Sequence, residues 1–319
     1  MTRKLLLKVF DMQYFNRDSL KRVAQEGMPK LNNVVGPMAG DIVWQQESLP
    51  IASSKIRSLE AVGLTHAGFV RVRNEDCFYL KTQPVHHQLT EEQSVQGVFV
   101  LCDGIGGYEQ GDVASSMATF RLAQDLLGHG YPEFTADISL KSSIYKVNQD
   151  IYQENQRLKQ LGLGTMGTTA VAATLQDQEV SIVHIGDSRC YRITESKGLE
   201  QLTLDHERGQ SHIAQGLSSQ DAYAELDAYY LTQALGPAPN NRIAPDVNHL
   251  TIQENSLFLL CTDGLSDNDL VESFWQSHLM PYVSAERSLN EGIQNLLDLA
   301  LQKNGHDNIT ILLFRVCLI

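Results

Sequence analysis

Two closely spaced pairs of β-rich runs constrain most strongly how this chain can fold. In "AATLQDQEVSIV" (172–183) and "CYRITESKGLEQL" (190–202), only a short polar turn separates one run from the next. Turns this short join antiparallel neighbours, because parallel strands need a crossover of about a dozen residues or more. The two segments therefore predict β-hairpins and argue against a Rossmann-type parallel sheet.

Other parts of the chain add strands and amphipathic helices. The runs "GVFVLC", "SLFLLCT" and "NITILLFRVCLI" have strand length and are rich in β-branched and aliphatic residues. Helical periodicity gives apolar stripes, which are Leu140, Ile144, Val147, Ile151 and Leu158 in one helix, Leu289, Ile293, Leu296 and Ala300 in another, and Val113, Met117 and Phe120 at the start of a third. Hairpins combined with helices that have one apolar face predict an α+β fold with helices covering sheets.

Charge and cysteine usage narrow the class of protein. The formal charge of −13 argues against a nucleic-acid binder or a ligand of anionic membranes, whose surfaces are basic. The five cysteines are scattered and form no C-x-x-C pair, which argues against a zinc ribbon and fits a reducing compartment. The apolar run near the start is broken by Lys8 and Asp11, and no segment has the length of a membrane span. We expect a cytoplasmic protein.

Residues 1–56 differ from the rest of the chain. They show little periodicity and contain several Gly and Pro residues, and only "FNRDSLKRVAQEG" (15–27) has a helical pattern. From about residue 57 onward the strand and helix patterns become regular. The sequence therefore predicts an N-terminal extension of unknown role over 1–56 and one large domain over 57–319.

Acidic residues stand at the ends of several predicted strands. They are Asp103 in "VFVLCDGIGG", Asp263 and Asp267 in "LFLLCTDGLSD", Asp307 in "NGHDNITILL", and Glu75 and Asp76 in "RVRNEDCFYL". For any one of them, a turn or helix cap is the simpler interpretation. If the strand ends meet, however, the carboxylates converge and repel one another unless a cation lies among them. Ligands that are all oxygen favour Mg²⁺, Mn²⁺ or Ca²⁺, and Gly104 lets its carbonyl approach such an ion.

A cluster this acidic can hold two ions roughly 3.5–4 Å apart, which is the arrangement of many phosphate-ester hydrolases. A phosphate group also needs a fixed cation, and Arg71 lies four residues before Glu75. From spacing alone, a solvated surface arginine is an equally good interpretation of Arg71. If this segment is a strand, Arg73 points to the opposite face.

These segments together resemble the metal-dependent protein serine/threonine phosphatases (PPM, or type 2C) in their bacterial form. The resemblance covers residues 57–319 and follows the family's order of motifs, which are here "GFVRVRNEDCF", "LCDGIGGYEQGDVAS", "GTMGTTAVAATL", "VHIGDSRCYRI", "LTLDHE", "LTQALG", "LLCTDGLSDNDL" and "GHDNITILL". It implies a four-layer sandwich of two stacked antiparallel sheets flanked by helices on both sides. It also implies a flap at about residues 205–235.

The resemblance further implies a role for each matching residue. Asp103 would bridge two metals, the Gly104 carbonyl would bind the second, and Asp263 and Asp307 would bind the first. Glu75 and, more weakly, Asp76 would act through coordinated waters. Asp187 and Asp267 would hold a third, weaker ion together with Asp263, and Arg71 would hold the substrate phosphate. Ser188 and Arg189 would be structural.

The implied reaction is hydrolysis of phosphoserine and phosphothreonine on proteins by a hydroxide that bridges two Mn²⁺ or Mg²⁺ ions. Substrates would be products of a Ser/Thr kinase, and the protein would be a monomer. Some positions depart from the family's pattern, namely His66, Ile105 where some relatives have a histidine, Glu207, and Gln233 where arginine is usual. Because Ile105 cannot donate a proton, a metal-bound water becomes the expected acid. A non-catalytic module that binds phosphoproteins is the alternative from another class, and a phosphatase dedicated to one signalling protein is a third.

Overall fold

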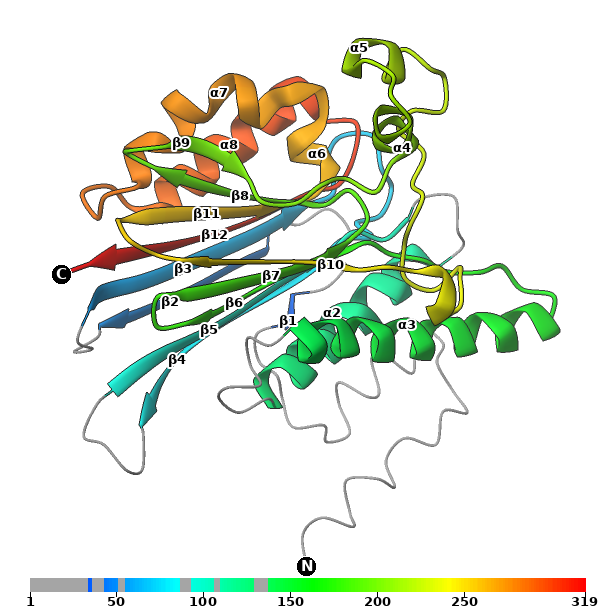
Figure 1. Cartoon of the computed structure of the whole chain (residues 1–319), viewed down its shortest axis with the longest axis horizontal. Coiled ribbons are helices and arrows are strands. Elements are labelled where there is room, and N and C mark those ends of the chain that lie inside the picture. The colour runs from blue at the N-terminus through cyan, green and yellow to red at the C-terminus, as the bar shows by residue number, and fades with distance from the viewer. Residues whose placement is uncertain (1–33, 36–42, 51–54, 87–92, 106–109, 129–136) are drawn as a thin grey trace, which may run out of the picture. The chain divides into compact units, whose positions relative to one another are not determined.

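Two six-stranded antiparallel sheets form the framework of the protein in a computed structural model (Figure 1). The structure describes residues 34–35, 43–50, 55–86, 93–105, 110–128 and 137–319. The first sheet has the order β1 (Val34–Val35), β4 (Cys77–His86), β5 (Gln93–Cys102), β6 (Ala170–Gln176), β7 (Glu179–Ile185) and β10 (Asp246–Thr251). The second has the order β2 (Val43–Pro50), β3 (Ile56–His66), β12 (Ile309–Leu318), β11 (Ser256–Cys261), β8 (Arg189–Thr194) and β9 (Gly198–Gln201).

The predicted hairpins are confirmed. Strands β6 and β7 pair in antiparallel register from Ala170 opposite Ile185 to Gln176 opposite Glu179. Strands β8 and β9 pair in the same sense from Tyr191 opposite Gln201 to Thr194 opposite Gly198. The turn of the first hairpin contains Asp177 at a positive φ of 52°, a conformation that aspartate tolerates better than most residues.

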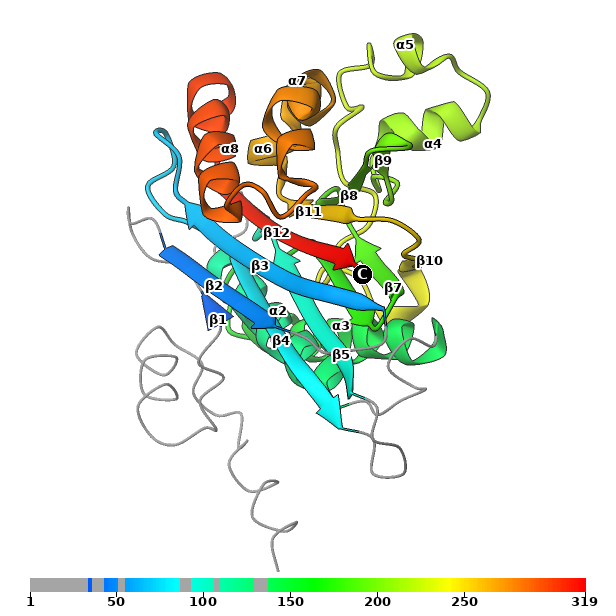
Figure 2. The same cartoon turned by 90° about the vertical axis from the view of Figure 1, so that its left-hand side faces the viewer.

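Helices cover the outer face of each sheet, as the four-layer prediction requires (Figures 1 and 2). Helices α2 (Gly111–Gly128) and α3 (Asp137–Gln160) lie against the first sheet, and α6 (Asp263–Ser266), α7 (Leu270–His278) and α8 (Leu289–Asn304) lie against the second. Between β9 and β10 the chain forms the short helices α4 (Arg208–Ala214) and α5 (Ser219–Ala222). Single 3-10 turns occur at η2 (Asn240–Arg242), η3 (Asp267–Asp269) and η4 (Met280–Tyr282).

The predicted stripes of α3 and α8 are buried, but the stripe predicted for α2 is wrong. Val113, Met117 and Phe120 are only half buried, and the buried face of α2 is made mainly of small residues, including Ala114, Ala118 and Ala123. Small side chains let the helix axis approach the sheet closely. The hydroxyl of Thr119 accordingly reaches the carbonyl of Cys77 at 3.2 Å. A search for large apolar residues cannot identify a face of this kind.

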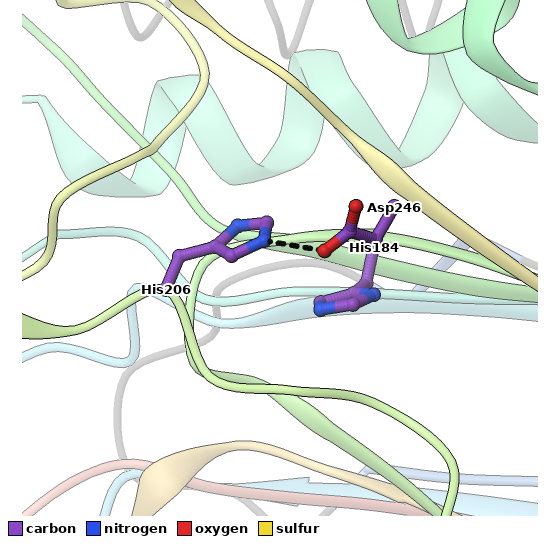
Figure 3. A group of neighbouring side chains, drawn as sticks. All are labelled: His184, His206 and Asp246. Carbon is purple, nitrogen blue, oxygen red and sulfur yellow. Dashed lines mark hydrogen bonds and ion pairs between the residues drawn. The ribbon is translucent and has the colours of Figure 1, made fainter. Parts of the chain in front are cut away.

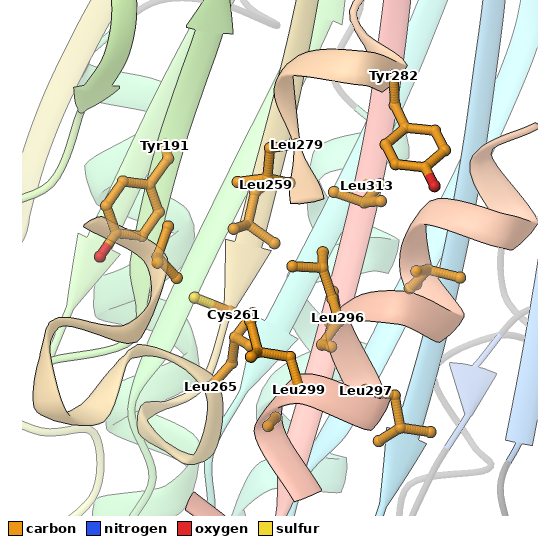
Figure 4. Packing of buried hydrophobic residues seen from close by; sticks show 14 of the residues in the cluster. Tyr191, Leu259, Cys261, Leu265, Leu279, Tyr282, Leu296, Leu297, Leu299 and Leu313 are labelled. Atoms are coloured by element: carbon orange, nitrogen blue, oxygen red, sulfur yellow. The ribbon is translucent and has the colours of Figure 1, made fainter. Parts of the chain in front are cut away.

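Apolar side chains fill the interface between the two sheets and the interface between the second sheet and its helices. Between the sheets, the ring of Phe314 stacks on Phe99 and Phe258 with centroid distances of 4.1 and 4.5 Å. The interface between the second sheet and its helices is mostly aliphatic and includes Leu259, Leu296 and Leu313 (Figure 4). Each fully buried side chain of this size stabilises the fold by about 1.5–3 kcal/mol. These packed interfaces hold the strand ends of the two sheets in fixed relative positions.

The domain starts earlier than residue 57, so the predicted boundary is too late. Strand β2 pairs with β3 along its whole length, and Glu47 of β2 accepts hydrogen bonds from Thr82 N and Lys81 Nζ of β4 at 2.5 and 3.1 Å. Asn33–Ile319 accordingly form one compact unit. The helix predicted over residues 15–27 lies outside the described residues.

All five cysteines are buried and none forms a disulfide, as expected for thiols that act as small apolar side chains. In the described segments, no helix is both long enough and apolar enough to cross a membrane.

Candidate active site

The predicted site residues meet at one end of the two sheets. A cavity of about 790 Å³ opens there between the end of β5, the start of β4 and β12, and the segments after β7 and β11. The predicted residues that line it are Arg71, Glu75, Asp103, Gly104, Asp187, Asp263 and Asp307. Asp76 and Asp267 do not line it. The convergence of strand ends is therefore observed, while the roles of these residues as ligands stay predictions.

The backbone of Asp103 is held rigidly by the segment before β6. The amide of Asp103 donates to Thr169 Oγ1 at 3.1 Å, and its carbonyl accepts from Thr169 N at 2.8 Å and Thr168 Oγ1 at 2.7 Å. Thr169 Oγ1 also shares a hydrogen bond of 2.7 Å with Ser188 Oγ, which fits the structural role predicted for Ser188. This network gives the "GTT" segment a physical role, which is to fix the carboxylate at the end of β5.

Gly104 has no room for a side chain. A Cβ at this position would lie 2.5 Å from the carbonyl oxygens of both Glu75 and Gly111. Its amide donates to Glu75 O at 3.1 Å. The glycine is thus required by the close approach of two backbone segments, in addition to any approach of its own carbonyl to an ion.

Asp76 lies fully buried beneath the cavity. Its Oδ2 accepts hydrogen bonds from Thr310 Oγ1 at 2.6 Å and Thr262 Oγ1 at 3.1 Å, whereas Oδ1 is buried without a hydrogen-bond partner. Burial raises the pKa of Asp76 to about 7. A buried carboxylate oxygen with no partner calls for a proton or a cation beside it.

Asn308 organises the loop that carries Glu75, and sequence reasoning missed it. Its Oδ1 accepts from Glu75 N at 2.8 Å, and its Nδ2 donates to the carbonyls of Ala67 and Arg73 at 3.0 and 2.9 Å. The amide side chain thereby ties the start of β12 to the whole segment before β4. Its position directly after Asp307 was the only available signal.

Burial and mutual repulsion dominate the electrostatics of the cavity. The pKa values of Asp103 and Asp263 are raised well above the ordinary range, first by burial and then by neighbouring carboxylates. The pKa of Glu75 is raised as well, chiefly by burial. These carboxyl groups therefore hold their protons to higher pH than ordinary carboxyl groups do, unless positive charge enters the cavity.

Arg71 supplies positive charge at the cavity wall. Its Nη2 donates to Asp307 Oδ2 at 2.5 Å, and the guanidinium side chain remains 46% exposed. The expected strand geometry around it is wrong, because residues 67–76 form a loop and β4 begins only at Cys77. Arg73 consequently lines the same cavity as Arg71 and does not point to an opposite face. The loop turns at Gly68, whose φ is +73°, and Gly68 N donates to His66 Nδ1 at 2.9 Å.

A second group of acids lies around Asp187, which itself lines the cavity. Burial raises the pKa of Asp187 to about 7, and Glu207 is the largest of the neighbouring charges that raise it further. Asp267 raises the pKa of both Asp187 and Asp263, although it does not line the cavity. Arg189 binds Asp205 with an Nη2–Oδ2 distance of 2.7 Å, which fits its predicted structural role.

The segment predicted as a flap forms α4 and α5 and returns to the cavity at Tyr229–Leu231. Its base is tied to the first sheet, because the backbones of Thr168 and Leu235 exchange hydrogen bonds of 3.1 and 2.9 Å. Gln233, which stands where the family has arginine, accepts from Ala244 N through Oε1 at 2.6 Å. Gln233 thus has an anchoring contact of its own, which an arginine side chain could not make because a guanidinium has no acceptor.

His184, His206 and Asp246 form a further group whose ligand atoms lie within 4.8 Å of one another (Figure 3). The two imidazole rings stack with centroids 4.8 Å apart. Gly186 N donates to His206 Nδ1 at 3.1 Å, which directs the Nε2 proton of His206 toward Asp246 Oδ2 at 3.2 Å. His184 Nε2 faces the carbonyl of Leu204 at 2.9 Å. With both nitrogens of His206 engaged, this group braces the base of the flap against β7 and β10.

Two stacked antiparallel sheets with a carboxylate-lined cavity at their common end define a hydrolase suited to hard divalent cations. The family model described as Protein phosphatase 2C matches residues 85–301, and the chain belongs to this family. A serine/threonine phosphatase Stp of Listeria monocytogenes is 31% identical over 259 residues, which are 78% of this chain and 92% of that protein.

Solved structures agree with this assignment. The serine/threonine phosphatase PstP/Ppp of Mycobacterium tuberculosis is similar with a TM-score of 0.63 and 26% identity, covering 81% of this chain and 99% of that one. The serine/threonine phosphatase Stp1 of Staphylococcus aureus gives a TM-score of 0.63 at 25% identity, with 86% and 98% covered. The predicted family and fold class are thus confirmed.

Proposed function

We propose that this protein hydrolyses phosphoserine and phosphothreonine in other proteins with the help of bound divalent cations. The observation that carries the proposal is that Asp103, Asp263, Asp307 and Arg71 line the same cavity. Carboxylates and a guanidinium that line one cavity can hold cations and a phosphate group at the same place.

The side chains around the cavity fit a hard divalent cation. Every candidate donor is an oxygen, the pKa values of Asp103 and Asp263 are raised by burial among other acids, and Asp76 keeps a buried Oδ1 without a partner. We assign Asp103, the Gly104 carbonyl, Asp263 and Asp307 as direct ligands of two Mn²⁺ or Mg²⁺ ions. Glu75 and Asp76 would act through water, and Asp187 and Asp267 would contribute to a weaker third site.

When bound, such cations supply a water of lowered pKa and neutralise charge on the phosphoryl group. Arg71 would bind two phosphoryl oxygens and orient the phosphorus toward the carboxylates. Thr168 and Thr169 keep Asp103 from shifting, and Asn308 does the same for the Glu75 loop. Among the described residues that line the cavity there is no histidine, so this wall offers no imidazole to protonate the leaving serine or threonine oxygen.

Substrates of this kind are made by Ser/Thr kinases, and we propose that the protein acts on such products as a monomer. Five buried cysteines, none of them in a disulfide, support a reducing compartment, and we propose the cytoplasm. The net charge of −13 disfavours nucleic acid and anionic membranes as partners.

Release of inorganic phosphate from a phosphothreonine peptide and from an aryl phosphate tests the proposal. After exhaustive treatment with a chelator, we expect no turnover of either substrate, and we expect added Mn²⁺ or Mg²⁺ to restore it. Full activity in chelator would contradict the role of the cations. Binding of the peptide without hydrolysis in any metal would favour the non-catalytic module instead.

A further inference from the structure

Large apolar side chains stand exposed at the mouth of the phosphatase cavity. Val72 is 90% exposed, Tyr229 is 66% exposed and Tyr230 is 64% exposed, and all three line the same cavity as Arg71. Val72 comes from the loop before β4, whereas the tyrosines come from the returning segment of the flap. Two segments far apart in the sequence thus place apolar surface around one opening.

The flap side of this opening is braced from behind. The ring of Tyr229 packs on Tyr223 with centroids 5.3 Å apart, and the Tyr223 hydroxyl donates to Glu207 Oε2 at 3.0 Å. Gln210 Nε2 donates to the same hydroxyl at 3.0 Å. The backbone is held too, because Arg208 N donates to Tyr230 O at 3.0 Å. The tyrosines are therefore positioned before any ligand arrives, which lowers the entropic cost of binding.

The loop on the other side is also fixed. Phe69 N donates to Gly305 O at 2.8 Å, and the Phe69 ring fills the space beside Gly305, where a Cβ would lie 2.7 Å from the ring. Asn308 holds the carbonyl of Arg73 at 2.9 Å. Val72 lies between these two anchors.

The position of these residues relative to the acids indicates what they contact. A phosphorylated side chain must reach Arg71 and the carboxylates inside the cavity, so the neighbouring residues of the same peptide lie at its mouth. In an extended peptide, successive residues are about 3.3 Å apart, and the first neighbours on either side of the phosphoresidue fall within reach of the rim. Asp221 and Glu225 of the flap are exposed as well, and the chain has a net charge of −13, which disfavours acidic neighbours of the phosphoresidue.

We propose that Val72, Tyr229 and Tyr230 form an apolar clamp for the residues next to the phosphoresidue, so that the preferred substrates are phosphorylated segments with apolar neighbours. The proposal rests on the proposed phosphatase function and specifies its substrate class. Transfer of one or two aliphatic side chains from water to such a clamp gives about tenfold discrimination. Acidic neighbours are disfavoured.

Three phosphothreonine peptides that differ only in the residues flanking the phosphothreonine, which are Leu, Ser or Glu, test the clamp. With the full chain and saturating Mn²⁺, we expect kcat/KM for the Leu peptide to exceed that for the Ser peptide about tenfold, with the Glu peptide lowest. In Tyr229→Ala, Tyr230→Ala and Val72→Ser the ratio of Leu to Ser peptides should fall, and in the triple variant it should approach one. Because the readout is the ratio of kcat/KM for the Leu and Ser peptides, a loss of activity that affects both peptides equally does not change it.

Ile138→Ser is the matched control, because Ile138 is 85% exposed on α3 and does not line the cavity. It should keep both the activity and the ratio of the unaltered chain. If the unaltered chain hydrolyses the Leu and Ser peptides equally well, the clamp is overturned while the phosphatase function stands. If no peptide is hydrolysed in the presence of metal, both proposals fail. Faster hydrolysis of the Glu peptide than of the Ser peptide would overturn the predicted charge preference.

Discussion

At the level of single residues, Asp307 has two competing partners. It accepts a 2.5 Å hydrogen bond from Arg71, and it is also a proposed cation ligand. Replacement of Arg71 by Ala should therefore have opposite effects on two ligands. We expect tighter Mn²⁺ binding in titration calorimetry, because the Asp307 carboxylate no longer has to give up its ion pair with Arg71 in order to bind the cation. We expect kcat/KM for a phosphopeptide to fall roughly tenfold to a hundredfold, the equivalent of a lost charge-assisted hydrogen bond.

Two further variants make this prediction specific. Arg71→Lys keeps the charge but not the planar geometry, so its kcat/KM should lie between those of the unaltered chain and Arg71→Ala. Arg73→Ala should cost less than Arg71→Ala, since Arg73 lines the cavity without the contact to Asp307. A larger loss in Arg73→Ala would identify Arg73 as the phosphate ligand.

The carboxylates allow a second prediction, in which activity and stability change in opposite directions. In Asp263→Asn, a buried group that repels its neighbours becomes neutral. We expect kcat to fall on the order of 10³-fold or more. In chelator at pH 8, the melting temperature should rise relative to the unaltered chain. An Asn variant that keeps normal turnover would show that Asp263 is only a turn residue.

At the level of elements, the edge strand β2 makes the N-terminal boundary testable. Removal of residues 1–54 strips β2 from β3 and leaves the partners of Glu47 on β4 without their acceptor. We expect the melting temperature to drop by roughly 10 °C or more, or the protein to become insoluble. A chain that begins at residue 33 retains the compact unit and should melt close to the full chain. Equal stability of the two truncated chains would assign β2 no role in the fold.

The same element shows where sequence patterns stop being informative. The hairpins of β6–β7 and β8–β9 follow from local spacing, and so do the helices α3 and α8. Strand β2 has the sequence "VWQQESLP", whose many polar residues do not predict a strand. It is stabilised by pairing with β3, and the local sequence pattern of β2 does not reveal this partner. The alternation in "RVRN" is compatible with a strand, but residues 67–76 form a loop, because alternation alone does not supply a neighbouring strand to pair with.

The candidate site was predictable in part because its acids mark strand ends. Asp103, Asp263 and Asp307 follow or precede apolar runs that the sequence displays, and the family's motifs assign them roles. The residues that hold these acids in place could not be predicted in the same way. Asn308, Thr262 and Thr310 act through partners more than forty positions away along the chain, as in the bond from Thr262 to Asp76. Only the register of the sheets brings such residues together.

At the level of the whole molecule, the acidic cavity couples stability to pH and to cations. Folding raises the pKa of Asp76, Asp187 and Glu207 to about 7, compared with ordinary values of about 4, and raises those of Asp103 and Asp263 as well. Because these folded-state pKa values lie above the unfolded ones, the folded state binds more protons between about pH 4 and pH 7. The stability that these groups contribute is present below pH 4 and is lost as the pH rises through their folded pKa values.

This coupling predicts that divalent cations reverse a pH trend. In chelator, the melting temperature should fall between pH 5 and pH 8 as buried carboxyl groups are forced to ionise beside one another. With excess Mg²⁺ or Mn²⁺, the melting temperature should instead rise over the same range, because cations bind the deprotonated groups and stabilise the folded state by mass action. Differential scanning fluorimetry in the two conditions measures both slopes, and Asp103→Asn combined with Asp263→Asn should make both slopes smaller, while Asp76, Asp187 and Glu207 still contribute. Parallel slopes with and without cations would mean that the carboxylates at the strand ends do not bind metal.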